Sequence, residues 1–427
     1  MQQTRSRFPV AAFPRLAPTL LMISALAAGA ATLSASAQTP QGNSSPAPAT
    51  SSDAERDQRF ARWVADFSTG ARTAGISEET LRLAFADIRF IPRVTELDGA
   101  QPEFTRAVWD YLDSAVSAQR VVRGQDRLLQ SRPAVDAAAA RYGVPAEILA
   151  AIWGLESNYG SNTGDIPTID ALASLGFEGR REAWARSQLL AALKILQNRD
   201  ISRAQMIGSW AGAMGQTQFL PSNFLAYAVD ADGDGRRDIW GSLPDVMAST
   251  ANFLARSGWQ AGQPWGMEVY LPQGFDYALA DAATRQPASA WAALGVRSGS
   301  GVPLPPLADS AILLPAGARG PAFIVGPNFR TILRYNNSTS YALAVSLLSQ
   351  ALAGVPAVQA AWPRDLQPLS RSQLMALQTT LNARGFDSGT PDGMMGPATQ
   401  SSIRRYQRSV GLAADGYPTL ELLRGLQ

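Results

Sequence analysis

The sequence predicts a mainly α-helical (α+β) protein, in which a helical domain carries a small β-rich insertion and a separate three-helix module follows. Apolar residues recur at helical spacing from Asp53 onward. Between about Trp265 and Ile332 the pattern changes to short β-prone runs, such as "SAILLP" and "PAFIVG", among prolines and glycines. Residues 369–427 repeat a turn-then-helix pattern of their own. The length of 427 residues fits two or three domains.

The N-terminal segment 1–37 is predicted to be a signal peptide. Three arginines precede an apolar run over about 16–33, and "SASAQ" offers a cleavage site after Ala37. An uncleaved anchor helix is the alternative. Since the chain has no cysteine, a lipid anchor on an N-terminal Cys is excluded, and we expect a periplasmic protein. Cleavage removes three arginines and no acid, so the formal charge falls from +2 to −1 (2 − 3), which gives no reason to expect a nucleic-acid partner.

Two chemically important residue types are missing from the sequence. There is no histidine and no cysteine, which excludes disulfides, thiol nucleophiles, Ser-His-Asp triads and Cys/His zinc sites. Lys194 is the only lysine, so lysine chemistry is also disfavoured. Any proton transfer in this protein therefore falls to Asp, Glu or Tyr.

The composition divides the chain beyond residue 37 into four parts. Residues 38–55 are rich in Pro, Ser and Thr, which is typical of a flexible linker. The helical domain follows over 56–353, with its β-rich insertion at about 262–332. Residues 354–368, "GVPAVQAAWPRDLQP", are interpreted as a second linker.

Local signals predict several helix boundaries. Ser77, ahead of two glutamates, predicts a helix start. Gly143 ends one helix, and Pro145 opens the next at the position where a missing N–H costs little. Apolar spacing predicts further helices over 182–197, 221–228, 244–256 and 340–352, the last of them capped by Ser338 or Thr339.

The last part, 369–427, is predicted to be a binding module. Leucines at 374, 377 and 381 mark a helix that Gly385 stops. An Asp-Gly turn followed by Pro and Thr occurs twice, at 392–399 and 415–419, where it most simply serves turn and capping chemistry. Because so short a unit buries only a small core, we expect it to bind rather than catalyse.

Glu156 is the candidate catalytic residue. If Pro145–Tyr159 form a helix, Glu156 lies on the same stripe as Leu149, Ile152 and Trp153, three and four residues apart. Desolvation there raises the pKa of a carboxyl above the usual ~4.3, and a carboxyl protonated near neutral pH can act as a general acid. The alternatives are a Glu paired with a nearby Arg or reaching solvent at the helix end.

Three separated segments of the sequence resemble the same family of enzymes. "ARYGVPAEILAAIWGLESNYG", "GSWAGAMGQTQFLPSNF" at 208–224 and "RYNNSTSYALAV" at 334–345 resemble the B-type lytic murein transglycosylases, a lysozyme-like group of glycoside hydrolase family 103. The resemblance covers most of 56–352 and implies a lysozyme-like helical catalytic core. Residues 369–427 separately resemble the small peptidoglycan-binding domain of cell-wall enzymes.

The resemblance implies cleavage of the β-1,4 bond between N-acetylmuramic acid and N-acetylglucosamine without water. Glu156 protonates the departing oxygen and then acts as base while the sugar's 6-hydroxyl closes a 1,6-anhydro ring. An internal nucleophile removes the need for the second carboxylate of ordinary glycosidases, although Asp165 and Asp170 stay open as partners. A hydrolytic muramidase and a non-catalytic peptidoglycan-binding scaffold are the alternatives.

The resemblance also assigns substrate-binding positions. Ser209 is expected to hydrogen-bond Glu156 or the acetamido group, or to serve only as a turn residue, and Gln218 to bind a sugar. Tyrosines suit carbohydrate because they join a flat apolar face to a polar tip. An arginine pair suits the anionic peptide stem or lactyl group, with an exposed structural pair as the alternative. The other expected residues are Tyr111, Arg180, Arg181, Tyr335, Asn336 and Tyr341.

"DADGDGRRDIWG", at 230–241, has the alternating acids and the sixth-position glycine of a calcium loop. Position 12 holds Gly241 instead of a bidentate Glu, and Asp245 can supply that oxygen, as in a variant loop of the resembling family. The expected ligands are Asp230, Asp232, Asp234, the carbonyl of Arg236, and Asp245, with Asp238 at position 9. We expect a structural Ca²⁺ and no cofactor for the chemistry. A solvated turn and a calcium sensor are the alternatives.

The expected partner is the peptidoglycan glycan strand, which the resemblance implies for both the helical domain and the C-terminal module. Proteins of cell-wall synthesis or division are candidate further partners, and we expect a monomer.

Overall fold

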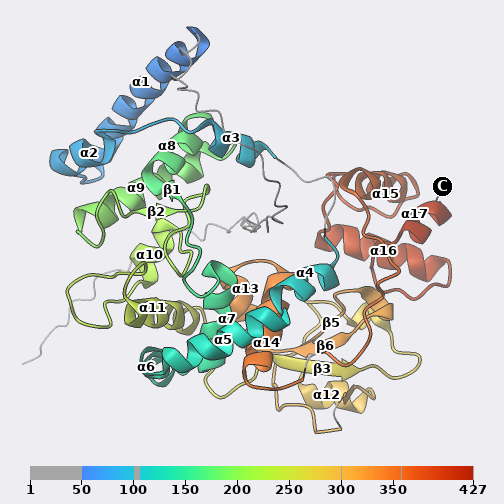
Figure 1. The fold of residues 1–427 in the computed structure, drawn as a ribbon. Coiled ribbons are helices and arrows are strands. Elements are labelled where there is room, and N and C mark those ends of the chain that lie inside the picture. Colours follow the sequence, from blue (N-terminus) through green and yellow to red (C-terminus); the bar gives the residue numbers. More distant parts are fainter. Residues whose placement is uncertain (1–50, 101–105, 300, 357, 427) are drawn as a thin grey trace, which may run out of the picture.

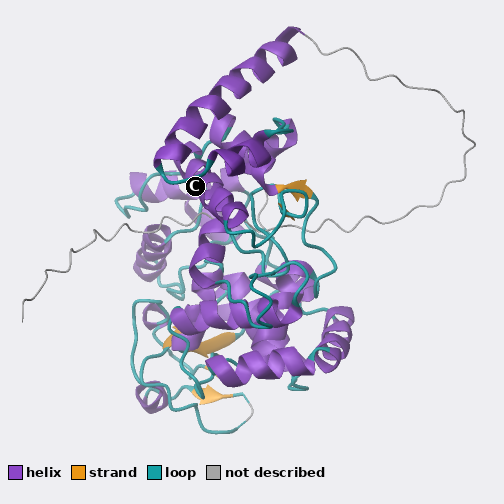
Figure 2. Cartoon of the chain, turned by 90° about the vertical axis from the view of Figure 1, so that its left-hand side faces the viewer, coloured by secondary structure: helices purple, strands orange, loops and turns teal. Residues whose placement is uncertain are grey.

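The computed structural model describes residues 51–100, 106–299, 301–356 and 358–426, so the predicted signal peptide and residues 38–50 lie outside it. Most of the described chain is helical (Figure 1), and strands form only small patches among the helices (Figure 2). The prediction of a mainly α-helical (α+β) fold is thereby confirmed. In the described ranges, no helix is long and apolar enough to cross a membrane.

Helices α1 to α6 precede the Glu156 segment, and their ends follow the local signals. Ser77 caps α2 by accepting the N–H of Thr80 at 3.2 Å, and Gly143 ends α6 with φ of 69°. Because α1 already begins at Ser51, the predicted linker is wrong for residues 51–55, where Asp53 favours the helix N-terminus. The bounds are α1 Ser51–Thr73, α2 Glu78–Phe85, α3 Pro92–Gly99, α4 Val108–Ala115, α5 Ala118–Gln130 and α6 Arg132–Tyr142.

The helical domain continues through α7 and closes with α13 and α14. The bounds are α7 Ala146–Ser157, α8 Thr168–Glu178, α9 Glu182–Gln197, α10 Pro221–Tyr227, α11 Leu243–Arg256, α13 Pro327–Tyr335 and α14 Thr339–Leu352. A short antiparallel pair, β1 (Ile166–Pro167) with β2 (Ile207–Gly208), joins the segment after α7 to the segment before α10. The helices predicted from apolar spacing are confirmed to within about one residue at each end.

α7 is the central helix of this domain. Leu149 and Ile152 have no exposed surface, and α7 contacts α5, α6, α11 and α14. Burying each such side chain contributes roughly 1.5–3 kcal/mol, so the apolar run holds the helix in place. Pro145 is the N-cap rather than the first helical residue, and α7 ends at Ser157, before the predicted end at Tyr159.

The β-rich insertion is a four-stranded antiparallel sheet in the order β4-β3-β6-β5. Its strands are β3 (Gly266–Tyr270), β4 (Arg297–Ser298), β5 (Ala311–Leu313) and β6 (Ala322–Val325), with the short helix α12 (Ala288–Ala293) beside them. Trp291 is fully buried in a separate small core beneath the sheet. The insertion ends earlier than predicted, because Pro327 starts α13 inside the expected range.

The C-terminal module consists of α15 (Arg371–Ala383), α16 (Pro397–Ser409) and α17 (Leu420–Leu426) around its own leucine-rich core. Its internal repeat has a physical basis. Gln378 accepts the N–H of Gly393 at 2.8 Å, and Gln407 accepts the N–H of Gly416 at 2.8 Å. A helical glutamine thus holds each Asp-Gly turn, which agrees with the turn role expected from the sequence.

The module rests against the β-rich insertion (Figure 1). Arg404 of α16 is 8 % exposed and pairs with Asp281, and Asp415 accepts the N–H of Ala318 at 2.8 Å. The described residues of the connecting segment, 354–356 and 358–368, form no helix or strand, but hydrogen bonds hold part of them in place. Glu268 accepts backbone N–H groups from it.

Candidate active site

Glu156 lies in the last turn of α7, where the backbone reverses direction. Asn158 and Tyr159 adopt left-handed conformations, with φ of 49° and 59°, and Gly160 follows with φ of 80°. Consecutive non-glycine residues in this region cost energy and persist only where the surroundings hold them. The Ser157 hydroxyl accepts the N–H of Gly160 at 3.1 Å, which closes the reversal directly behind Glu156.

The surroundings of Glu156 favour its neutral form. The residue is half-buried, and burial raises the pKa of its carboxyl to about 7. A hydrogen bond from Tyr341 to Oε1, at 2.6 Å, acts in the opposite direction and is the smaller effect. No arginine or lysine of the described chain forms an ion pair with Glu156. The structure therefore does not show the alternative in which Glu156 pairs with a nearby arginine.

Three tyrosines from three helices lie close enough to Glu156 for its charge to act on them: Tyr111 of α4, Tyr335 at the end of α13, and Tyr341 of α14. Burial raises the pKa of each, to about 12 for Tyr111, and the charge of Glu156 adds to the effect. They therefore stay protonated, and Tyr341 donates its hydroxyl proton to Glu156. Tyr335 donates to the carbonyl of Thr217 at 2.7 Å, which ties α13 to the loop 208–219.

Ser209 and Gln218 organise the loop 208–219. The Ser209 hydroxyl accepts the N–H of Ala213 at 3.1 Å, a turn bond that matches the simpler of its two expected roles. Gln218 has φ of 50° and donates to the carbonyls of Thr163 and Gly215, each at 3.0 Å. It thereby links this loop to the loop that follows Glu156.

Arg180 and Arg181 both contact one buried acid, while the side chain of Arg180 is 50 % exposed. Asp98, 3 % exposed, pairs with Arg181 at 3.0 Å and accepts the backbone N–H of Arg180 at 2.8 Å. Arg181 also lies over the ring of Trp184. Asn336 is half-buried and forms the C-terminal cap of α13, next to Tyr335. Ser338, one of the two residues expected to cap the following helix, is the N-cap of α14.

The two candidate second carboxylates are placed differently from Glu156. Asp170 is 4 % exposed and is engaged by Arg203 and by the N–H of Arg89. Asp165 is exposed. Neither is among the groups that shift the pKa of Glu156.

Gln216 also lies at the site, although no pattern in the sequence singles it out. It accepts a hydrogen bond from the indole of Trp153, one turn before Glu156, and donates to the carbonyl of Trp240, both at 2.8 Å. A glutamine next to a glycine in "GQTQF" is an ordinary loop residue by local pattern. Only the spatial approach of residues 153 and 240 gives it a role.

The acidic loop, residues 230–245, connects α10 to α11. Carboxylate oxygens of Asp230, Asp232 and Asp234 lie within 4.8 Å of one another. Asp245 is fully buried and accepts the N–H groups of Ala231 and Asp238, each at 2.7 Å. These bonds close the loop on the N-terminus of α11.

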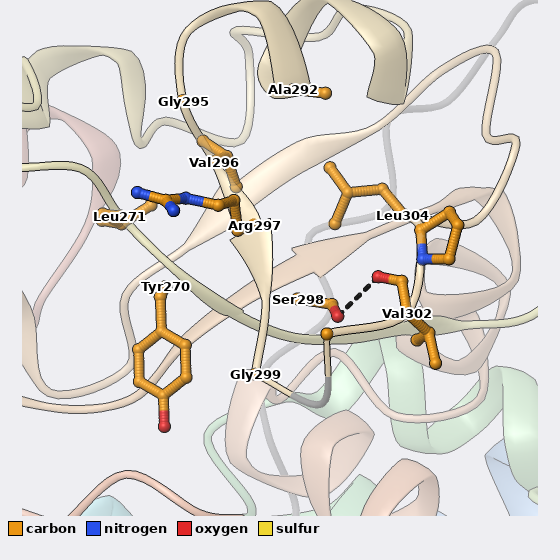
Figure 3. A pocket seen from close by; sticks show the side chains of 12 residues that line it. Tyr270, Leu271, Ala292, Gly295, Val296, Arg297, Ser298, Gly299, Val302 and Leu304 are labelled. Atoms are coloured by element: carbon orange, nitrogen blue, oxygen red, sulfur yellow. Dashed lines mark hydrogen bonds between the residues drawn. The ribbon is translucent and has the colours of Figure 1, made fainter.

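A cavity of about 610 Å³ lies beside strands β3 and β4 (Figure 3). It is lined by residues such as Tyr270, Arg297 and Leu304, and a bond from Ser298 to the carbonyl of Val302 shapes its wall. None of the described residues that line it is acidic. The described residues that line it therefore offer no carboxyl for glycoside cleavage, and Glu156 stays the candidate acid.

Comparison with known proteins agrees with this geometry. Residues 59–350 match the family of transglycosylase SLT domains, and residues 370–426 match the peptidoglycan-binding domain family. Membrane-bound lytic murein transglycosylase B of Escherichia coli (strain K12) is 36 % identical over 222 residues, which is 50 % of this chain. The match spans only 58 % of the length of that protein.

Two solved structures are similar as well. SltB3 of Pseudomonas aeruginosa, in complex with NAG-anhNAM-pentapeptide, is 52 % identical with a TM-score of 0.84, covering 86 % of this chain and 99 % of that one. The Escherichia coli lytic transglycosylase Slt35 in complex with calcium is 31 % identical with a TM-score of 0.57, covering 69 % and 92 %. The chain therefore belongs to the transglycosylase SLT domain family, among the B-type lytic transglycosylases, and carries a peptidoglycan-binding domain over residues 370–426.

Proposed function

We propose that this protein is a lytic murein transglycosylase that cleaves the β-1,4 bond between N-acetylmuramic acid and N-acetylglucosamine and leaves 1,6-anhydromuramic acid ends. The observation that carries the proposal is the single carboxyl of Glu156, whose pKa is raised to about 7 by burial. The complex of SltB3 with NAG-anhNAM-pentapeptide supports the substrate class. This pKa leaves a large neutral fraction near neutral pH, as a general acid requires.

In the first step, Glu156 donates its proton to the bridging oxygen as the bond from that oxygen to C1 of the muramic acid breaks. Tyr341 donates to Oε1 and stabilises the carboxylate that forms. In the second step, the 6-hydroxyl oxygen bonds to C1 and its proton passes to Glu156, which restores the acid. No water enters, and the intramolecular nucleophile has the advantage of proximity.

The C-terminal module and the N-terminal segment complete the proposal. The module, α15 to α17, holds the glycan strand while the helical domain cuts it. The signal peptide directs the chain to the periplasm, where peptidoglycan is found, and the protein acts there as a monomer. The match of residues 370–426 to a peptidoglycan-binding domain supports the role of the module. The arginines and the apolar run of residues 1–37 support export to the periplasm.

We also propose that the acidic loop binds a structural Ca²⁺. The residues fit this ion, since carboxylate oxygens of Asp230, Asp232 and Asp234 lie within 4.8 Å of one another and Ca²⁺ takes six to eight oxygen ligands. The carbonyl of Arg236 and a carboxylate oxygen of Asp245 would complete the set. When bound, the ion neutralises clustered negative charge and holds α10 against α11. It takes no part in the proton transfers of Glu156.

The test is digestion of purified sacculi by the wild type and by Glu156→Gln, with muropeptide masses as the readout. Glu147→Gln, in the first turn of the same helix, is the matched control. We expect anhydro products from the wild type and the control, and a loss of at least about 10²-fold for Glu156→Gln with sacculus binding kept. Products heavier by one water indicate a muramidase, and undiminished digestion by Glu156→Gln indicates that Glu156 is not catalytic.

A further inference from the structure

Gln216 makes three hydrogen bonds that join separate parts of the molecule. Its Oε1 accepts from Nε1 of Trp153, its Nε2 donates to the carbonyl of Trp240, and its backbone N–H donates to the carbonyl of Ile239, all at 2.8 Å. Trp153 belongs to the catalytic helix, while Ile239 and Trp240 belong to the acidic loop. One half-buried side chain therefore connects the two regions directly.

On the catalytic side, Gln216 contacts both the helix and the reversal that follows it. Trp153 lies three residues before Glu156, on the same face of α7, and is 5 % exposed. Its ring packs edge-on against Tyr159, with centroids 5.6 Å apart. Gly160 lies so close that a Cβ there would be 2.4 Å from Oε1 of Gln216. Gln216 thus supports the strained segment 158–160 immediately after Glu156.

On the loop side, the carbonyl that Gln216 binds is itself fixed by the aspartates. Asp238 accepts the N–H of Trp240 at 2.8 Å, and its own N–H donates to Asp245 at 2.7 Å. The packing is close as well, since a Cβ at Gly215 would be 2.6 Å from the carbonyl oxygen of Ile239. A continuous path therefore runs from Asp245 through residues 238–240 and Gln216 to Trp153.

We propose that Gln216 is a positioning residue for the reaction: through Trp153 and Trp240 it holds Glu156 in place and makes that position depend on the order of the acidic loop. A glutamine suits this role because its amide offers an acceptor and a donor on one planar group. This inference rests on the proposed function, since it concerns the placement of the proposed acid.

The test compares Gln216→Leu, which loses both side-chain bonds, with Gln216→Glu, which keeps the acceptor for Trp153 and loses the donor for Trp240 when ionised. Gln205→Leu, on an exposed glutamine, is the matched control. On soluble glycan strands, we expect Gln216→Leu to lower kcat at least about tenfold with KM changed less than about threefold. The rates of Gln216→Glu and of the wild type are compared at each pH. We expect the two rates to converge as the pH falls, because the new carboxyl becomes protonated and can donate to the carbonyl of Trp240.

A second readout does not depend on activity. We expect the indole N–H of Trp153 to exchange with solvent faster in Gln216→Leu, and also in Asp238→Asn, which loosens the loop at the other end of the path. Combining the two substitutions is expected to lower kcat by less than the product of the single effects, because both act through one connection.

The inference is overturned if Gln216→Leu keeps wild-type kcat and wild-type exchange at Trp153, or if the two substitutions multiply as independent sites. Should Gln216→Leu fail to fold, the pH-dependent recovery of Gln216→Glu decides instead, and its absence counts against the proposal. A wild-type enzyme that releases no anhydro products would contradict the proposed function, while the exchange measurement would still report on the connection.

Discussion

The carboxyl of Glu156 and the carboxyl groups of the acidic loop differ in how many hydrogen-bond donors surround them. Within the described ranges, Glu156 receives a single hydrogen bond, from Tyr341, and no backbone N–H. Asp230 accepts two backbone N–H groups, and Asp238 also accepts two. The first arrangement favours a neutral acid, whereas the second stabilises negative charge, as a cation site needs. Burial and hydrogen-bond donors together therefore distinguish the two regions, since desolvation is the larger effect on the pKa of Glu156 and its one donor, Tyr341, the smaller.

The largest expected effect is a pH-dependent change in the free energy of unfolding when Glu156 is replaced. Its pKa is raised from about 4.5 unfolded to about 7 folded, so its contribution to stability is full below pH 4.5 and is lost as the pH rises through 7. We expect Glu156→Gln to be more stable than the wild type above pH 7, by on the order of 3 kcal/mol, with little difference near pH 4. Urea unfolding across this range measures it. A difference that is constant with pH would mean that Glu156 does not titrate as described.

The next effect is expected at the acidic loop. Ca²⁺ at a hundred times its dissociation constant is expected to raise the free energy of unfolding by about 2.7 kcal/mol, and chelation to reverse the gain. Thermal unfolding with Ca²⁺, Mg²⁺ or chelator measures it, with Mg²⁺ as the control. We expect Asp230→Asn combined with Asp234→Asn to abolish the response. A response that survives the double substitution would place the ion elsewhere.

A smaller effect is expected from the tyrosine that binds Glu156. Removing the hydroxyl in Tyr341→Phe deletes a bond that stabilises the carboxylate, so we expect kcat to fall about tenfold. Since that bond lowers the pKa of Glu156, its loss raises the pKa and moves the alkaline limb of the pH–rate profile to higher pH. In Tyr335→Phe, whose hydroxyl binds Thr217 instead, that limb is expected to stay in place. An unmoved limb in Tyr341→Phe would contradict this account.

The smallest effect is expected at Asp165, the exposed candidate for a second carboxylate. We expect Asp165→Asn to change the rate of sacculus digestion less than about twofold, because the ring closure needs no further acid or base. The measurement is the release of muropeptides under the same conditions as for Glu156→Gln. A tenfold loss would point instead to a two-carboxylate mechanism.

The helical framework follows from local signals in the sequence. Ser77 and Ser338 accept backbone N–H groups at helix starts, and Gly143 takes the left-handed conformation that ends α6. The stripe of α7 that carries Glu156 is equally local, because residues three and four apart share a face of any helix. Three motifs in the right order also pointed to the family. Each of these signals lies within a few residues of the feature it predicts.

The contacts that give the site its chemistry are not local. Tyr341 lies 185 residues beyond Glu156, and Asp98 meets Arg181 across 83 residues. Gln216 reaches Trp153 across 63 residues. No spacing rule connects such pairs, because packing of the helices decides which side chains meet.

The sequence alone therefore determined where the helices run, which carboxyl lies on an apolar face and which family the chain resembles. The tertiary structure alone decided that no arginine or lysine in the described ranges pairs with Glu156, that Arg180 and Arg181 contact Asp98, and that Gln216 bridges α7 and the acidic loop. The physical reason is range: caps and periodicity act over one or two turns of chain, whereas burial and hydrogen-bond partners are set by side chains that only the folded molecule brings together.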